Sequence, residues 1–566
     1  MIAVNRVADD GSPAGPIHDR PGVSLYDDNA GSAVRGTISP IHATKEKPMT
    51  TLNYDYVIVG GGSAGCVLAA RLSEDPDVRV ALVEAGGPDD APEISVPIAF
   101  PTLFKTKFDW DFSSECEPAL GRRRLYLPRG KMLGGSSSMN AMIYIRGNPT
   151  DFDDWAKQGA SGWSYQDMLP YFKIAENNEL NSHFHGQLGP LSVRNSRSMH
   201  PLVDRFVRAG IEAGYPHNDD FNGVSQLGVG RFQVTQRDGA RCSAAMAYLH
   251  PATRRANLRV FIDSPVTRLL FDGTRATGVL VVRERAEQTL YADREVILSA
   301  GVYGSPQILM LSGIGPSDHL ASLGITPRID LPVGHNLQDH PAVYLNYLTD
   351  EPSLFGAGSQ ADIELYQREQ RGPMSSNIGE GGGFMMSRTS LENPDIQLIT
   401  GPAMFVDEAL SPPSDHAFVL GPNLLKPTSR GRVALRSTRA DAKPRIFCNF
   451  LTTPEDRESM ITGVRIALDI ARQPSLAAVT RSTYQAPESD SEADIWSFVQ
   501  QYTSTIYHPT STCCMGSVVD PALRVLGTER LRVVDASVMP SIVRGNTNAT
   551  VIAIAEKAVD LILDRG

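Results

Sequence analysis

A glycine-rich motif early in the sequence has the residue types and spacing that bind the pyrophosphate of a dinucleotide. Residues 60–65 read GGGSAG and match GxGxxG directly after an apolar, β-branched run. Gly60 permits a tight turn, Gly62 lets backbone N–H groups approach a pyrophosphate at the positive end of a helix, and Gly65 permits close packing of helix on strand. Glu84, about 24 residues after Gly60, can accept hydrogen bonds from a ribose diol. The motif alone leaves FAD and NAD open.

The elements around this motif form a unit that would position it. Residues 54–59 (YDYVIV) predict a buried parallel strand, and residues 63–72 carry apolar side chains at helical spacing. Residues 78–85 (VRVALVEA) predict a second strand that ends at Glu84 and Ala85. A lone GxGxxG also occurs as a structural turn, but strand, glycine turn, helix, strand and acid in this order favour dinucleotide binding.

The composition bounds the class of protein. The chain has 566 residues, 41% hydrophobic and 21% charged, which is enough to bury a large core in about two domains. The net charge of −11 disfavours nucleic-acid binding. The six cysteines form no CxxC pair and suggest neither a disulfide scaffold nor a metal site, so a reducing compartment is expected. No apolar run is long enough for a membrane helix, which favours a cytoplasmic protein with at most peripheral contact to the inner membrane.

The first 52 residues predict a disordered extension, because they are rich in Gly, Pro, Asp and Ser and lack helical or strand periodicity. Met49 stands just before the first predicted strand, and codons for Lys45-Glu46 can form a purine-rich stretch upstream of it. One hypothesis is that translation starts at Met49 and that the preceding residues are a start-site misassignment. The alternative is a genuine flexible tail.

Several further segments resemble one known family. Residues 128–147 (PRGKMLGGSSSMNAMIYIRG) and 299–315 (SAGVYGSPQILMLSGIG) are similar to the two signature segments of the glucose–methanol–choline (GMC) family of FAD-dependent oxidoreductases. Residues 507–516 (YHPTSTCCMG), 533–558 (VVDASVMPSIVRGNTNATVIAIAEKA) and 333–340 (VGHNLQDH) resemble other parts of that family. The resemblance runs from about residue 54 to the end. Within the family, the sequence is most similar to the choline, aliphatic alcohol and polyethylene glycol dehydrogenases.

The resemblance implies a mixed α/β fold in which a discontinuous Rossmann-like FAD-binding domain is interleaved with an antiparallel-sheet substrate domain. The FAD-binding domain is expected at 53–161, 222–340 and 503–566, and the substrate-binding domain at 162–221 and 341–502. Within the substrate side, residues 204–213 predict a helix and 432–437 a strand. Residues 353–384 predict a pocket-lining loop, in which Glu380 faces either substrate or solvent.

The implied cofactor is FAD. The small-residue loop 134–138 would let backbone approach the cofactor, and the Asn140 amide could hydrogen-bond the ring. Met139 stands where a covalently flavinylated subset of the family has its histidine, so the FAD is expected to be non-covalent. The expected cofactor-binding residues are Gly60, Gly62, Ser63, Ala64, Gly65, Glu84, Ala85, Gly134, Gly135, Asn140, Ala141, Met142, Val266, Asp535, Ala536, Asn546, Thr547 and Asn548.

The resemblance also implies a catalytic pair. His508 falls at the position of the family's base, which removes the hydroxyl proton while hydride passes to flavin N5, and a neutral histidine suits that task near pH 7. Asn546 falls at the second catalytic position, where an amide can stabilise the developing alkoxide. Without this context both residues would be ordinary loop residues. His335 and His340 favour structural or cofactor-side roles, and the Cys513-Cys514 pair favours a buried structural role.

The expected function is therefore FAD-dependent oxidation of a primary alcohol to an aldehyde, with electrons passed to a quinone or another acceptor. An oxidase that uses O₂ is the first alternative. A fatty-acid photodecarboxylase is disfavoured, because such an enzyme needs a specific Cys and Arg in its pocket. The positions that match them best hold Gly379 and Ile399 here. A non-catalytic flavoprotein is disfavoured by the presence of both His508 and Asn546. The sequence leaves the alcohol and the oligomeric state open.

Overall fold

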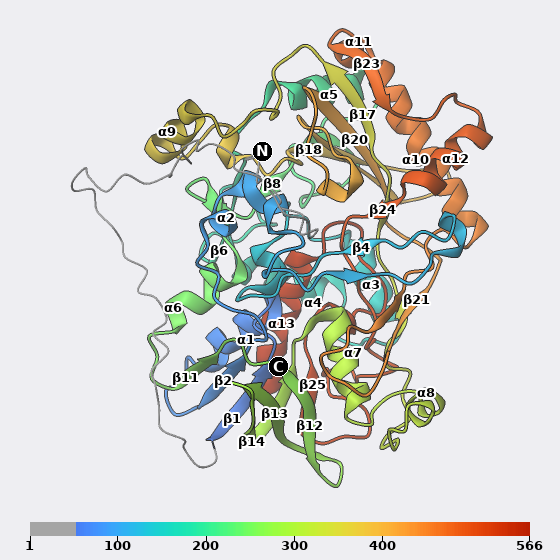
Figure 1. Cartoon of the computed structure of the whole chain (residues 1–566). Helices are drawn as coiled ribbons and strands as arrows, with labels where there is room; N and C mark the ends of the chain where they lie inside the picture. The colour runs from blue at the N-terminus through green and yellow to red at the C-terminus, as the bar shows by residue number, and fades with distance from the viewer. Residues whose placement is uncertain (1–51, 566) are drawn as a thin grey trace, which may run out of the picture. The chain divides into compact units, whose positions relative to one another are not determined.

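The computed structural model describes residues 52–565, a unit of mixed helices and strands. The predicted extension and Met49 lie outside the described residues, except that Leu52 already belongs to the first strand. Two large sheets organise this unit, one in the lower and one in the upper part of Figure 1. The lower sheet has seven strands in the order β11-β2-β1-β14-β13-β12, with β25 beside β14. Their bounds are Leu52–Val59 (β1), Val80–Val83 (β2), Leu258–Phe261 (β11), Val266–Asp272 (β12), Arg275–Arg283 (β13), Ala286–Leu298 (β14) and Leu531–Val533 (β25).

The predicted dinucleotide unit is present in this sheet. β1 lies between β2 and β14 and is parallel to both, and helix α1 (Ser63–Leu72) has the predicted bounds. β2 is shorter than predicted, because the chain turns away at Glu84. A Cβ atom on Gly65 would lie 1.8 Å from the carbonyl oxygen of Gly60, so only glycine allows the helix to start this close to the strand.

The second large sheet has eight strands and is antiparallel throughout. The order is β23-β17-β20-β19-β18-β7, with β16 paired to β20 and β24. The bounds are Gly228–Arg231 (β7), Pro341–Ala342 (β16), Leu345–Thr349 (β17), Gly381–Met385 (β18), Ile396–Gly401 (β19), Ala417–Leu424 (β20), Thr480–Gln485 (β23) and Ser504–Thr505 (β24). A mainly parallel sheet and a separate antiparallel sheet confirm the predicted fold class.

Short sheets and helices complete the unit. The minor strands are Phe112–Ser113 (β3), Tyr126–Leu127 (β4), Glu176–Asn178 (β5), Leu191–Asn195 (β6), Gln233–Val234 (β8), Gln236–Arg237 (β9), Ala240–Arg241 (β10), His335–Leu337 (β15), Gly431–Ala434 (β21) and Arg445–Phe447 (β22). The remaining α-helices are Pro92–Ser95 (α2), Pro149–Lys157 (α3), Tyr165–Ala175 (α4), Pro201–Glu212 (α5), His250–Ala252 (α6), Gly301–Leu311 (α7), Ser317–Ser322 (α8), Gln360–Glu369 (α9), Pro454–Arg472 (α10), Pro474–Ala477 (α11), Glu492–Tyr502 (α12) and Asn548–Ile562 (α13).

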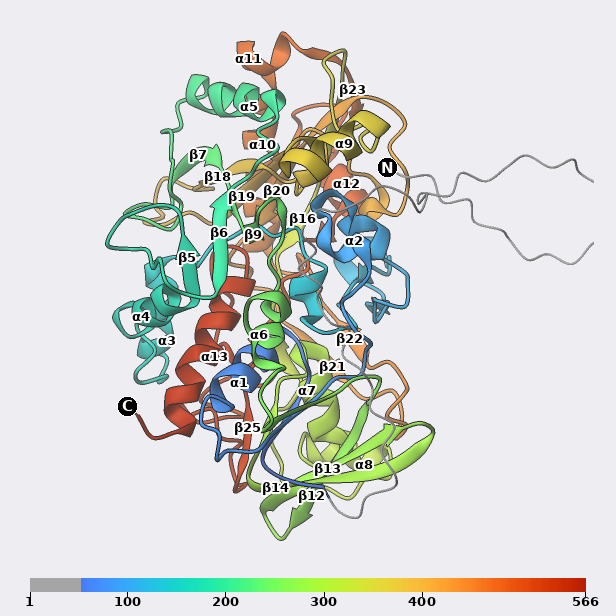
Figure 2. The same cartoon turned by 90° about the vertical axis from the view of Figure 1, so that its left-hand side faces the viewer.

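Helices α1 and α13 lie side by side although they come from opposite ends of the chain (Figure 2). The buried Glu556 of α13 accepts hydrogen bonds from Arg71 of α1 and from Tyr248, at 2.8 Å each. Most side chains of both helices are buried. The N-terminal ends of these helices are also joined, because Ser63 Oγ donates to Asn548 Oδ1 at 2.7 Å. The packing of α1 against α13 therefore brings the glycine turn next to the C-terminal NTNA segment.

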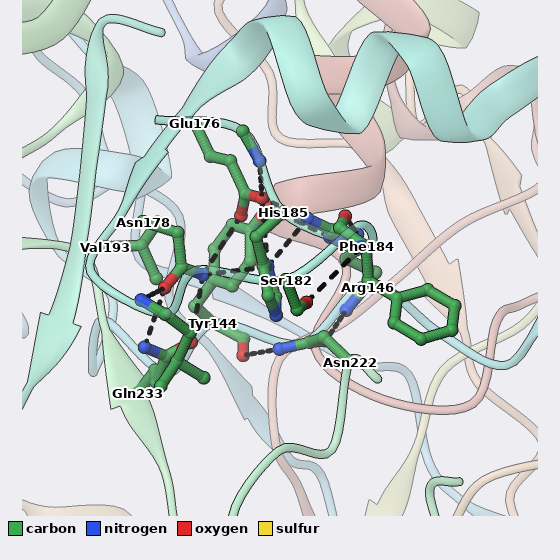
Figure 3. A network of polar contacts seen from close by, with 12 residues as sticks. Tyr144, Arg146, Glu176, Asn178, Ser182, Phe184, His185, Val193, Asn222 and Gln233 are labelled. Atoms are coloured by element: carbon green, nitrogen blue, oxygen red, sulfur yellow. Dashed lines mark hydrogen bonds and ion pairs between the residues drawn. The ribbon is translucent and has the colours of Figure 1, made fainter. Parts of the chain in front are cut away.

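A buried polar network holds the segment that follows the small-residue loop (Figure 3). The guanidinium of Arg146 pairs with the carboxylate of Glu176, and His185 Nδ1 lies 3.0 Å from the same carboxylate. The backbone N–H of Arg146 donates to Asn222 Oδ1 at 2.8 Å. The Arg146 carbonyl accepts from Thr550 Oγ1 at 3.0 Å. Every charged group in the cluster has an oppositely charged partner, which is the condition under which buried charges are tolerated.

The predicted elements of the upper part differ from the structure in detail. Helix α5 covers most of the predicted helix 204–213, whereas strand β21 covers only the first half of the predicted strand 432–437. The segment 353–384 is not only a loop, because it contains α9 and the start of β18. In the described range, no helix is long and apolar enough to cross a membrane. All six cysteines are free thiols.

Candidate active site

A cavity of about 860 Å³ lies among segments of both large sheets and is lined by residues from four distant parts of the chain. Its volume is within the range of cofactor and ligand sites. Seventeen of the nineteen residues expected at the site line it: Gly60, Gly62, Ser63, Ala64, Glu84, Ala85, Gly135, Asn140, Ala141, Met142, Val266, His508, Asp535, Ala536, Asn546, Thr547 and Asn548. Gly65 and Gly134 lie behind this wall, where Gly65 supports the glycine turn and Gly134 N donates to the Gly61 carbonyl.

One end of the cavity is built from backbone. A Cβ atom on Gly135, which has a φ of +52°, would lie 2.8 Å from Gly62 Cα, so the two glycine loops touch without side chains between them. Glu84 accepts hydrogen bonds from the backbone N–H groups of Gly61 at 2.8 Å and Gly86 at 2.7 Å. Burial raises the pKa of Glu84 to about 7, although these two N–H groups act in the opposite direction.

These residues fit a dinucleotide. The glycine contacts leave N–H groups and an open helix N-terminus facing the cavity, which suits a pyrophosphate, and Glu84 retains acceptor capacity for a ribose diol. Asp535 also lines the cavity, but its carboxylate is already engaged. It accepts from Gly301 N at 2.9 Å, Ser305 Oγ at 2.6 Å and Ser537 N at 2.8 Å. Asp535 therefore orders the start of α7 beside the cavity.

His508 and Asn546 come together at the other end of the cavity, 38 residues apart in sequence. Asn546 Nδ2 lies 3.2 Å from His508 Nε2, and Asn546 Oδ1 accepts from Gln397 Nε2 at 3.3 Å. His508 Nδ1 lies 3.0 Å from His340 Nδ1, and His340 Nε2 lies 3.0 Å from the carbonyl oxygen of Leu425. Five residues thus form one continuous chain of hydrogen bonds.

The donors and acceptors along this series of hydrogen bonds assign the tautomer of both histidines. A carbonyl oxygen only accepts, so His340 Nε2 carries the proton and, in the neutral ring, His340 Nδ1 is the acceptor. His508 must then donate from Nδ1, which leaves His508 Nε2 unprotonated. Asn546 donates to that atom from Nδ2. His508 Nε2 is therefore unprotonated, and its single lone pair accepts from the Asn546 amide.

Burial and fixed contacts keep His508 neutral and in place. Burial lowers the pKa of His508 well below its usual value, and the adjacent His340 and Arg129 act in the same direction. The buried carboxylate of Asp339 accepts from the backbone N–H groups of His508 at 2.7 Å and His340 at 2.8 Å, and from Thr505 Oγ1 at 2.9 Å. Asp339 thus holds the backbones of both histidines.

Reasoning from the sequence did not identify His340 or Gln397 as neighbours of the catalytic pair. His340 was expected to be structural or on the cofactor side, and the structure places it 3.0 Å from His508. The motif NLQDH contains both Asp339 and His340, and it was the signal available for them. Gln397 lies within β19, where nothing in the sequence distinguishes it from an ordinary strand residue.

The wall near His508 is mainly aromatic and aliphatic, with contributions from Phe100, Phe104, Tyr344, Ile378, Phe405, Ile506 and Tyr507. Two buried polar atoms in it, the Tyr507 hydroxyl and Asn377 Oδ1, have no hydrogen-bond partner within residues 52–565. Glu380 faces neither substrate nor solvent. It is fully buried, accepts from Ser376 Oγ at 2.6 Å and from His200 N at 2.9 Å, and stabilises the segment before β18.

We expect the buried His340 to make stability depend on pH. Burial lowers its pKa to about 3, whereas an unfolded histidine titrates near 6.5. Between these values the unfolded chain binds a proton that the folded chain does not, so stability falls as pH decreases below about 6.5. At about pH 5 the loss from His340 is ~2 kcal/mol. Urea unfolding at about pH 7.5 and 5 should therefore show that the wild type loses ~2 kcal/mol more than His340→Gln on acidification. An equal loss in both proteins would contradict the assignment.

Comparison with known proteins agrees with this site. Residues 54–342 match the model of the N-terminal GMC oxidoreductase domain, and residues 427–555 match that of the C-terminal domain. Mitochondrial choline dehydrogenase of Homo sapiens is 42% identical over 90% of this chain and 89% of its own length. An alcohol dehydrogenase [acceptor] of Pseudomonas putida is 40% identical over 90% of this chain and 96% of its own. Formate oxidase of Aspergillus oryzae, studied for the modification of its FAD, has a TM-score of 0.86 and 28% identity over 92% of this chain and 99% of its own.

The two domain models cover most of the described residues, and relatives at 40% identity or more extend over nearly all of them. FAD as the cofactor agrees with the glycine contacts and with the formate oxidase neighbour. The chain belongs to the GMC oxidoreductase family and is an FAD-dependent oxidoreductase that acts on CH–OH groups.

Proposed function

We propose that the protein oxidises a primary alcohol to an aldehyde and passes the electrons to a quinone or another acceptor, with His508 as the base. The observation that carries the proposal is the directed hydrogen-bond chain, which leaves His508 Nε2 unprotonated beside the Asn546 amide in the cavity. Alcohol oxidation needs a neutral base for the hydroxyl proton and a donor for the oxygen that becomes negative. This pair supplies both.

Each residue of the site has a separate role in the proposed reaction. An alcohol hydroxyl that enters between the two side chains donates to His508 Nε2 in place of the Asn546 amide, and the N–H of Asn546 Nδ2 that it displaces donates to the alcohol oxygen. His508 takes the proton, and the contact from Nδ1 to His340 holds the ring while Nε2 becomes protonated. Asn546 stabilises the developing alkoxide, and Gln397 keeps its amide oriented. FAD, when bound, would supply the acceptor for the hydride of the carbinol carbon.

The parts of the chain can be assigned to FAD binding and to substrate binding. We assign FAD binding to 53–161, 222–340 and 503–566, which contribute the seven-stranded sheet and both glycine loops. We assign substrate binding to 162–221 and 341–502, which contribute most of the antiparallel sheet and the aromatic residues Tyr344 and Phe405. Within the first part, we assign the cofactor contacts to the residues that the motifs indicate, with Val266 near Glu84 because Ser264 N donates to the Glu84 carbonyl.

The FAD should be held without a covalent bond, because Met139 lies in the cavity wall where a histidine would be needed for attachment. Precipitation of the holoenzyme with acid should therefore release all of the flavin into the supernatant. Absorbance of the two fractions is the measurement. A yellow pellet would show that another residue forms the link.

The relative named alcohol dehydrogenase [acceptor] supports an acceptor other than O₂, whereas two other relatives are named oxygen-dependent choline dehydrogenase. We propose a cytoplasmic enzyme that contacts the inner membrane peripherally when a quinone is the acceptor. The alternative within the family is an oxidase. After anaerobic reduction, mixing with aerated buffer separates them, since rapid second-order reoxidation would favour the oxidase.

A panel of alcohols with an artificial dye acceptor tests the function itself. Short and long alkanols, choline, aryl alcohols and glycols should be compared, with aldehyde formation as the readout. At least one primary alcohol should support turnover. A failure of every alcohol would favour a flavoprotein that has lost its chemistry, whereas light-dependent release of hydrocarbon from a fatty acid would favour the photodecarboxylase reaction.

A further inference from the structure

Arg241 is a buried cation without a carboxylate. Its side chain is 3% exposed, and no acidic group in residues 52–565 forms an ion pair with it. The other deeply buried arginines are paired, Arg146 with Glu176 (Figure 3) and Arg532 with Glu295. A buried charge without a counter-charge is costly, so the folded chain keeps Arg241 at this place against its own stability.

Four oxygen atoms fix the guanidinium beside the small-residue loop. Nε donates to the Ile94 carbonyl at 2.8 Å, and Nη1 donates to the Ser137 and Asn140 carbonyls at 3.2 and 2.7 Å and to Asn140 Oδ1 at 2.8 Å. Nη2 is buried and has no partner within the described residues. Burial lowers the pKa of Arg241 to about 9, which still leaves it protonated at neutral pH. The site therefore holds a positive charge at neutral pH.

The contact with Arg241 also determines which end of the Asn140 amide faces the cavity. Asn140 Oδ1 accepts from Arg241 Nη1 and from the backbone N–H of Met142 at 3.1 Å. Asn140 lines the cavity, and its Nδ2 makes no hydrogen bond with any residue between 52 and 565. The amide thus presents a donor, polarised by the guanidinium behind it, to whatever occupies the cavity.

Asn140 lies toward the end of the segment 135–141 that is nearer to the catalytic pair. This segment starts at Gly135, which touches Gly62 of the dinucleotide turn. It ends at Ala141, whose carbonyl accepts from Asn377 Nδ2 at 2.8 Å, and Met139 packs in one apolar cluster with Tyr507, the residue before His508. Two contacts of Arg241 are therefore with Asn140, between residues that pack in the cluster of Tyr507, and one is with Ser137, nearer to Gly135.

We propose that Arg241 is an electrostatic and positioning residue for the FAD: it orients Asn140 toward the cofactor, and its positive charge favours the reduced cofactor. Hydride transfer adds two electrons and one proton to FAD, so the cofactor becomes more negative by one charge. A fixed cation nearby stabilises that product and raises the reduction potential. This inference depends on FAD binding and not on which alcohol is oxidised.

The test is the reduction potential of FAD in the holoenzyme, measured by anaerobic chemical reduction in equilibrium with a reference dye. In Arg241→Met, the ratio of reduced to oxidised FAD at a fixed solution potential should fall at least tenfold, which is about 30 mV for a two-electron couple. Arg241→Lys keeps a cation only in the fraction that stays protonated at this buried place, so its ratio should fall by less than that of Arg241→Met. Both readings are independent of any alcohol, so failure of the proposed function would not alter them.

Asn140→Asp provides a second variant if Arg241→Met does not fold. The carboxylate can keep both acceptor contacts while neutralising the guanidinium, and it should lower the ratio at least tenfold as well. A wild-type potential in either variant would overturn the proposal. The proposal would also be overturned if oxidised and reduced FAD bound more weakly by the same factor, with the potential unchanged. That result would show that the charge of Arg241 acts on the pyrophosphate.

Discussion

Replacement of His508 by alanine should lower kcat/KM for the alcohol by about 10³- to 10⁴-fold, because general-base catalysis contributes up to about that factor. The loss should appear mainly in kcat, since the base acts on the transition state rather than on binding. Bound FAD should remain, because His508 is held by Asp339 and His340 and not by the glycine loops. Flavin absorbance per protein and steady-state rates with the dye acceptor are the measurements.

His335→Ala is the matched control for this variant. His335 stands in the same VGHNLQDH segment as His340, but its side chain is exposed and it lies at the start of β15. Its removal should change the rate by less than about twofold. If His508→Ala retained more than a tenth of the wild-type kcat/KM with full FAD content, His508 would not be the base.

Replacement of Asn546 by alanine should lower kcat by about 10²- to 10³-fold, the usual effect of removing one donor to a developing oxyanion. The same change removes the donor to His508 Nε2 and leaves Gln397 Nε2 without its acceptor. Gln397→Ala should have a smaller effect, about tenfold, because it only frees the amide to rotate. Single-turnover rates for the two variants give the comparison.

A double variant distinguishes cooperation from independent effects. If His508 and Asn546 act on one hydroxyl, His508→Ala combined with Asn546→Ala should lose little more than His508→Ala alone. Full additivity of the two losses would indicate that Asn546 acts elsewhere, for example only in holding the start of α13.

The dinucleotide unit could be predicted from the sequence because its signals are local. One short stretch contains Gly60, Gly62, Gly65 and Glu84. Each of these residues has a steric or hydrogen-bonding role that its position in the motif predicts. Helix α1 has the predicted bounds for the same reason. The strand after it is shorter than predicted, because Glu84 turns inward to bond Gly61 and Gly86, a contact that depends on the fold.

Other features depend on distant partners that a local pattern does not identify. His340 reaches His508 across 168 residues, and Arg241 has nothing in its neighbouring sequence to show that it is buried without a carboxylate. Helix α9 was missed within the segment 353–384 because it buries no side chain and therefore has no apolar stripe, although Ser359 and Asp362 form a capping box. Where side chains act through distant partners, the fold must be known first.

Anaerobic reduction of the bound flavin by a primary alcohol tests the central claim most directly, since it isolates proton removal and hydride transfer from the choice of acceptor. The wild-type holoenzyme should lose its flavin absorbance in a single rapid phase with at least one primary alcohol of the panel. His508→Ala with the same FAD content should do so at least about 10³-fold more slowly. Equal rates in the two proteins, or no bleaching of the wild type by any alcohol, would contradict the account.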